Sequence, residues 1–86
     1  MNNETRHDSI HPSDRVQVEV MLPDGSKTYE AEFSGMHNLD EIVETVDTRL
    51  RPEINPELCV FMIRNLSSGV EKRYRLNAHG NLHLIA

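Results

Sequence analysis

Hydrophobic and polar residues alternate with a period of two in the first part of the chain, along residues 16–21 and again along residues 27–33. This period, with β-branched and aromatic residues at the apolar positions, is typical of half-buried strands. The tetrapeptide Pro-Asp-Gly-Ser at 23–26 separates the two stretches. It favours a turn because Pro presets its own φ angle and Gly permits a positive φ. These residues therefore predict a β-hairpin.

A helical period follows between Asn38 and Pro52, with one apolar stripe formed by Leu39, Ile42, Val43, Val46 and Leu50. Asn38 is a favourable N-cap, and Glu41 stands three residues on, at the capping-box position. Acidic residues gather near the start of this segment and arginines at its end, at 49 and 51, an order that suits the helix dipole. The segment predicts one amphipathic helix, which Pro52 ends.

Three further stretches predict strands. Residues 58–63, Leu-Cys-Val-Phe-Met-Ile, form an unbroken apolar run whose length favours a central strand over a helix. Residues 70–76 alternate again, and residues 82–86 form a closing strand. The predicted order is β-β-α-β-β-β, which belongs to the α+β class, with the helix packed on one face of the sheet.

The remaining residues set the domain organisation. Residues 1–14 are polar and show no periodicity, so they predict a flexible leader before a single domain at 15–86. With 86 residues in all, the chain has little room for a deep pocket.

Charge and cysteine content narrow the function classes. Residues 1–50 carry eleven Asp/Glu against four Lys/Arg, and residues 51–86 carry three against five. A mildly basic half beside an acidic one does not suggest nucleic-acid binding, which calls for a dense basic face. Cys59 is the single cysteine, so no internal disulfide can form. No stretch has the apolar length of a membrane span or a signal core, and we expect a cytoplasmic protein.

The closing residues Asn81-Leu82-His83-Leu84-Ile85 are similar to the last strand of ubiquitin, which also reads Leu-His-Leu followed by a β-branched residue. The hairpin, helix and closing strand fall at separations similar to those of the ubiquitin core, over residues 16–85. On these points the chain resembles the ubiquitin-like β-grasp family. The resemblance implies a mixed sheet, with a partner-binding surface on the face opposite the helix and near the closing strand.

The end of the sequence departs from that family. Ubiquitin and the related sulfur carriers finish in a flexible Gly-Gly tail, which activating enzymes adenylate, whereas this sequence ends in Ile85-Ala86. We therefore expect a non-catalytic, adaptor-like module that binds another protein. A modifier or sulfur-carrier-type protein acting through its C-terminus is the alternative.

The predicted partner-binding face depends on which side of the sheet each strand residue points to. In the 58–63 run, either Cys59, Phe61 and Ile63 or the intervening Leu58, Val60 and Met62 point away from the helix. Spacing to the closing strand favours the first set. The predicted face is then Met21, Cys59, Phe61, Ile63, His83 and Ile85. An apolar patch of this kind usually marks an interface, with a partner or in a homodimer. A covering loop or the leader is the alternative.

A second candidate is the basic patch Arg64, Arg73 and Arg75, with Lys72 on the opposite side of its strand. It could meet an acidic partner or a phosphate backbone, which leaves a small nucleic-acid-binding protein as a further alternative. No aromatic stacking platform accompanies these residues, and a charged edge strand is the favoured interpretation.

The sequence indicates no catalytic residue, metal or cofactor. The pairs His7/His11 and His79/His83 have helical ligand spacing, but they lie in predicted leader, loop or strand. Cys59 lies in the most apolar segment, where a thiol is usually inert packing.

Overall fold

The computed structural model describes residues 10–77 and 79–85. In chain order its elements are β1 (Arg15–Met21), β2 (Lys27–Ser34), α2 (Leu39–Arg49), the short 3-10 helix η1 (Pro56–Leu58), β3 (Val60–Asn65), β4 (Glu71–Leu76) and β5 (Leu82–Leu84). The predicted β-β-α-β-β-β order is confirmed.

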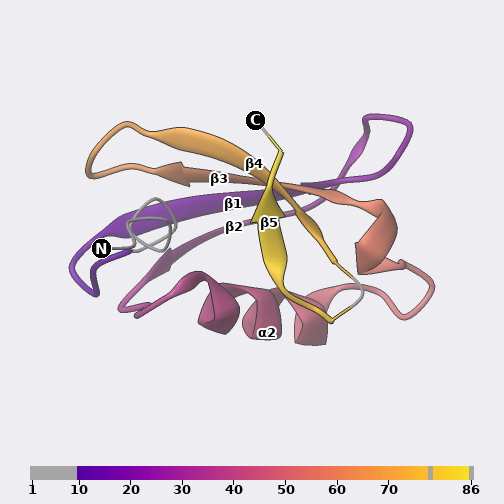
Figure 1. Cartoon of the computed structure of the whole chain (residues 1–86), viewed down its shortest axis with the longest axis horizontal. Coiled ribbons are helices and arrows are strands. Elements are labelled where there is room, and N and C mark those ends of the chain that lie inside the picture. The colour runs from indigo at the N-terminus through magenta and orange to yellow at the C-terminus, as the bar shows by residue number, and fades with distance from the viewer. Residues whose placement is uncertain (1–9, 78, 86) are drawn as a thin grey trace.

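The five strands form one sheet in the order β2-β1-β3-β4-β5, and every neighbouring pair is antiparallel. The predicted mixed sheet is therefore wrong, and the β-grasp arrangement is not confirmed. The reason is the crossover through α2, which carries the chain from β2 past β1 to β3 (Figure 1). β2 and β3 run in the same direction but are separated by β1, so no two neighbouring strands are parallel.

The β1–β2 turn is held by its own backbone. The N–H of Leu22 donates to the carbonyl of Ser26 at 2.8 Å, and the N–H of Gly25 donates to the carbonyl of Leu22 at 2.8 Å. Gly25 has a φ of 90°, which a residue with a side chain rarely adopts. The register shifts between Val20 and Met21, so a bulge lies where β1 enters the turn.

α2 begins after Asn38, whose side-chain oxygen accepts the N–H of Glu41 at 3.0 Å, and the predicted N-cap is confirmed. The Glu41 carboxylate accepts the N–H of His37 at 2.6 Å, one residue before the usual donor of a capping box. The helix ends at Arg49, two residues before the predicted Arg51. No helix within the described ranges is long and apolar enough to cross a membrane.

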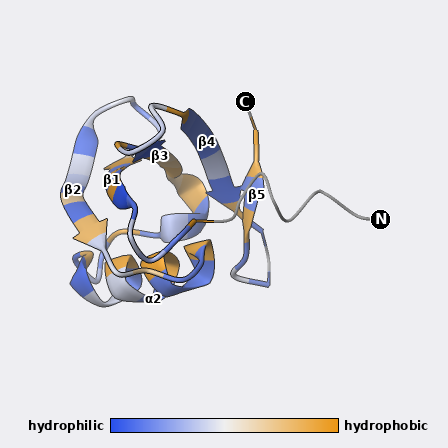
Figure 2. Cartoon of the chain, turned by 90° about the vertical axis from the view of Figure 1, so that its left-hand side faces the viewer, coloured by the Kyte–Doolittle hydropathy of each residue, from blue (hydrophilic) through white to orange (hydrophobic). Residues whose placement is uncertain are grey.

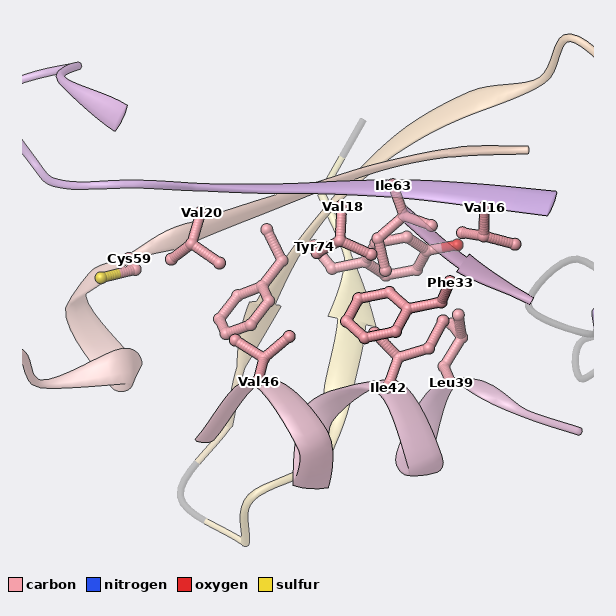
Figure 3. Packing of buried hydrophobic residues seen from close by; sticks show 11 residues of the cluster. Val16, Val18, Val20, Phe33, Leu39, Ile42, Val46, Cys59, Ile63 and Tyr74 are labelled. Atoms are coloured by element: carbon pink, nitrogen blue, oxygen red, sulfur yellow. The ribbon is translucent and has the colours of Figure 1, made fainter. Parts of the chain in front are cut away.

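The core lies between α2 and the sheet face that it covers, which we call the inner face (Figure 3). Its buried residues come from β1 to β4, from α2 and from Cys59 just before β3, namely Val16, Val18, Val20, Phe33, Leu39, Ile42, Val46, Cys59, Phe61, Ile63 and Tyr74. In Figure 2 hydrophobic colour marks the side of α2 turned to the sheet, whereas β4 is mostly hydrophilic. The amphipathic helix therefore packs as its stripe predicted.

The third strand starts later than the apolar run. Pro56–Leu58 form a short 3-10 helix, which the side chain of Asn55 caps by accepting the N–H of Glu57 at 3.0 Å. β3 consequently begins at Val60, and Leu58 is 56% exposed.

The facing of β3 is opposite to the predicted one. Cys59 and Phe61 are each 1% exposed and Ile63 is 5% exposed, because all three point into the core. Phe61 pairs with Val20 and Ile63 with Val18, and directly opposite residues of paired strands share a face. The prediction that Cys59, Phe61 and Ile63 point away from the helix is wrong.

Residues 10–14, the last part of the predicted leader, contact the domain. Ile10 packs against the core, and the N–H of Gly35 donates to the carbonyl of Pro12 at 3.0 Å. The side-chain amide of Asn65 donates to the Asp14 carboxylate at 2.9 Å. The rest of the predicted leader, residues 1–9, lies outside the described residues.

Candidate partner-binding face

The outer face is the side of the sheet turned away from α2, and the described helices leave it uncovered (Figure 1). Alternation along the strands and pairing across them place on it Arg15, Gln17, Glu19, Met21, Lys27, Glu30, Glu32, Val60, Met62, Arg64, Glu71, Arg73, Arg75 and His83. Charged side chains dominate this set, so the outer face is not the contiguous apolar patch expected from the sequence.

In the half of the outer face formed by β1 and β2, the charges are paired within the chain. Arg15 Nε lies 2.7 Å from Glu32 Oε2, and Lys27 Nζ lies 3.0 Å from Glu30 Oε1 and 3.7 Å from Glu19 Oε2. The hydrogen bond from Arg15 lowers the pKa of Glu32, and that from Lys27 lowers the pKa of Glu30. This half offers a partner few unmatched charges.

The other half, formed by β3 and β4, differs in this respect. Arg64 Nε donates to Glu71 Oε1 at 2.9 Å, and this hydrogen bond raises the pKa of Arg64. Arg73 and Arg75 are exposed, and within residues 10–77 and 79–85 neither has an ion pair. They stand two residues apart on β4 and so point to the same side.

Apolar side chains lie beside these arginines. Met62 is directly opposite Arg73, and both Met62 and Val60 are half-buried. On the other flank, the N–H of Ile85 donates to the carbonyl of Arg73 at 2.9 Å, and Ile85 is 42% exposed. The arginine pair therefore lies between apolar residues of β3 and of the chain after β5.

A shallow depression lies at the centre of the outer face and is lined by Gln17, Glu19, Met62 and Arg64. Its volume is about 150 Å³, including space open to solvent. Sites that enclose a small molecule usually measure roughly 300–1,000 Å³. The depression is therefore too small to enclose a cofactor.

The predicted partner-binding residues are divided by the structure. Met21 and His83 lie on the outer face, and Ile85 continues the alternation of β5 on the same side. Cys59, Phe61 and Ile63 lie in the core, where no partner can reach them without unfolding the domain.

The apolar residues that β3 presents on the outer face are Val60 and Met62, and not the predicted Cys59, Phe61 and Ile63. The sequence contained a signal for this choice in Arg64, which follows the apolar run. Burying an unpaired charge is costly, so Arg64 has to face solvent, and every second residue before it shares its face. The parity of Arg64 thus indicates Val60 and Met62 as the outward pair.

The predicted basic patch is brought together on the outer face. Arg64, Arg73 and Arg75 share one side, whereas Lys72 pairs with the inward-facing Ile63 and lies on the other. The structure adds that Glu71 neutralises Arg64, so two of the three arginines remain without an ion pair among the described residues.

The remaining candidates for chemistry lie elsewhere. Cys59 is buried, its thiol donates to the carbonyl of Asn55 at 3.5 Å, and burial raises its pKa, which keeps it in the unreactive protonated form. Within the described ranges no three His, Cys, Asp or Glu side chains are grouped to hold a metal ion. His7 lies outside these ranges.

Comparison with known proteins does not assign the chain to a family. No protein-family model matches the chain, and neither the curated proteins nor the solved structures contain a significant match. The function of the chain is therefore inferred from its own residues.

Proposed function

We propose that this chain is a non-catalytic protein-interaction module that binds a partner protein through the outer face of its sheet. The observation that carries the proposal is the group formed by Val60 and Met62 beside Arg73 and Arg75. No described helix covers these apolar side chains, and the two arginines have no ion pair among the described residues.

The composition of this group supports the proposal. Methionine and arginine are enriched in protein–protein interfaces, and the interface core excludes most other charged residues. Met62 and the stems of Arg73 and Arg75 can supply apolar contact area, while the guanidinium groups supply directional hydrogen bonds. A sheet face that no described helix covers suits a protein surface because a standard interface needs about 800 Å² from each partner.

A site-specific photo-crosslinker tests the proposal. It replaces Met62 on the outer face in one variant and Glu44, an exposed residue of α2, in a matched control. Each folded variant is irradiated in a lysate of the source cells, with and without an excess of the wild-type protein.

We expect a discrete crosslinked protein from position 62 that the wild-type competitor removes, and none from position 44. Crosslinking from position 44 alone would move the site to the helix. No competed product from position 62, in lysates where the variant stays folded, would reject the outer face as a binding surface.

A further inference from the structure

Arg73 and Arg75 indicate what kind of partner the outer face selects. The other Lys and Arg side chains of this face, Arg15, Lys27 and Arg64, each lie within 4 Å of a carboxylate of the same chain. Among the described Lys and Arg side chains of the outer face, only the two β4 arginines lack an ion pair within the chain. A charged group with no local partner gains most when a binding partner brings the opposite charge.

The geometry of the pair defines the complementary group. Residues two apart on a strand are separated by about 7 Å and point to one side. A guanidinium group binds a carboxylate through two parallel hydrogen bonds, so the pair can hold two carboxylates at that separation. An extended polypeptide with acidic residues at i and i+2 presents its carboxylates with the same spacing.

We infer that the partner docks an acidic, extended segment along β4, with carboxylates two residues apart on Arg73 and Arg75 and an apolar side chain against Met62 or Ile85. This inference rests on the proposed function and assigns the chemistry of the partner. The flanking apolar residues exclude water from the guanidinium–carboxylate contacts, which strengthens them.

A phosphate backbone fits this face less well. The acidic residues of β1 and β2, Glu19, Glu30 and Glu32, share the outer face and would lie along the path of a nucleic acid that extended past β4. The chain has four aromatic residues, and Tyr29, Phe33, Phe61 and Tyr74 all belong to or pack against the core. Among the described residues of the outer face no Phe, Tyr or Trp offers a ring on which a base could stack, and His83 supplies a single imidazole.

A random peptide library displayed on phage is the probe. It is selected on the immobilised full-length chain after depletion on the Arg73→Glu/Arg75→Glu double variant, with circular dichroism confirming that both are folded. We expect the recovered peptides to contain Asp or Glu at i and i+2 with a neighbouring apolar residue. Recovered peptides with no excess of acidic residues would overturn the inference.

Affinity measurements with one recovered peptide sharpen the test. Arg75→Glu is expected to weaken binding about ten- to hundredfold, the range for a lost hydrogen bond between charged groups. The matched control is Arg51→Glu, which changes the net charge equally at an exposed position after α2, and it should bind like wild type. Arg75→Lys keeps the charge but cannot form two parallel hydrogen bonds to a carboxylate, so its affinity should fall between those of Arg75→Glu and the wild type. Equal weakening by Arg75→Glu and Arg51→Glu would show a general charge effect and reject the site.

Two further measurements test other occupants of β4. Single-stranded oligonucleotide binding at low salt that Arg75→Glu abolishes would assign the arginines to phosphate. Sedimentation that shows an oligomer, dissociated by Arg75→Glu, would assign them to an interface with a second copy of the chain. Either result overturns the inference. If the competed crosslink from position 62 is unchanged in Arg75→Glu, the proposed function stands. Only the inference that the partner docks an acidic segment is then rejected.

Discussion

The inner and outer faces of one sheet differ in almost every respect, although their residues alternate along the same strands. The inner face carries the aromatic rings and the branched aliphatic side chains, and α2 covers it. The outer face carries ion pairs, two arginines without an ion pair among the described residues, and half-buried methionines. The inner face thus supplies the folding free energy, and the opposite side of the same layer is the one for which we propose partner recognition.

The difference teaches how to separate stability from binding in a chain of this size. A side chain on the inner face is removed from water whether or not a partner is present, so its substitution changes folding first. A side chain on the outer face loses its remaining exposure only in a complex. Adjacent residues of one strand can therefore serve as matched probes, one for each face.

The largest expected effect separates Phe61 from Met62. Phe61→Ala should lower the free energy of unfolding by about 3–5 kcal/mol, because it leaves a cavity at a residue that is 1% exposed. Met62→Ala, its neighbour on the outer face, should cost less than about 1 kcal/mol. Urea titrations of the two variants and the wild type measure both values. A larger loss for Met62→Ala would mean that β3 faces the other way.

The second pair is Cys59 and Val60. Cys59→Ser buries a hydroxyl in place of a thiol, with the Asn55 carbonyl as its nearest acceptor, and we expect a loss of about 1–3 kcal/mol. Val60→Thr adds a hydroxyl on the half-buried outer side and should change stability by under about 0.5 kcal/mol. Chemical denaturation gives the comparison, and equal losses would contradict the assignment of the two faces.

The third prediction concerns the cap that holds the helix over the inner face. Asn38→Ala removes the acceptor for the Glu41 N–H and should cost about 1 kcal/mol. Asn38→Asp keeps an acceptor at the same place and should retain most of the wild-type stability. Thermal unfolding followed by circular dichroism distinguishes them, and an unchanged midpoint in Asn38→Ala would show that the cap adds nothing.

The smallest effect is expected from pH, and it involves carboxylates outside the core. Hydrogen bonds lower the pKa values of Asp14, Asp24, Glu30, Glu32 and Glu41 below the ordinary 3.8 for Asp and 4.5 for Glu. The unfolded chain therefore takes up protons first as pH falls, so the stability these groups contribute is present above about pH 4.5 and is lost below it.

Equilibrium unfolding between pH 7 and pH 3 tests this carboxylate contribution. Glu32→Gln should have a shallower decline below about pH 4.5, because it removes one of the titrating groups on the outer face. Cys59 on the inner face affects stability at alkaline pH instead. Burial raises its pKa, so the stability linked to its protonated thiol is lost only as pH rises above the ordinary thiol pKa of 9.0. An unchanged profile in Glu32→Gln would exclude that carboxylate as a cause.

Part of the candidate site could be predicted from residues alone. Strand alternation was enough to place Arg73 and Arg75 on one side and Lys72 on the other, and the structure agrees. The pairing of Arg64 with Glu71 could not be predicted, since it needs the register of β3 against β4. The mixed sheet that the resemblance to ubiquitin implied was wrong, because a similar closing strand does not determine which strands become its neighbours.

The amino-acid sequence by itself determined the hairpin, the capped helix and the order of the elements, because turns, caps and periodicity act between residues close along the chain. Only the tertiary structure decided that every strand pair is antiparallel. Both sides of the run at 58–63 are apolar, so the run itself expresses no preference, and the sequence signals its facing only through Arg64, which follows it. The structure adds the contact that fixes this facing, because the buried valines of β1, some forty residues earlier in the chain, pair with Phe61 and Ile63 in the core.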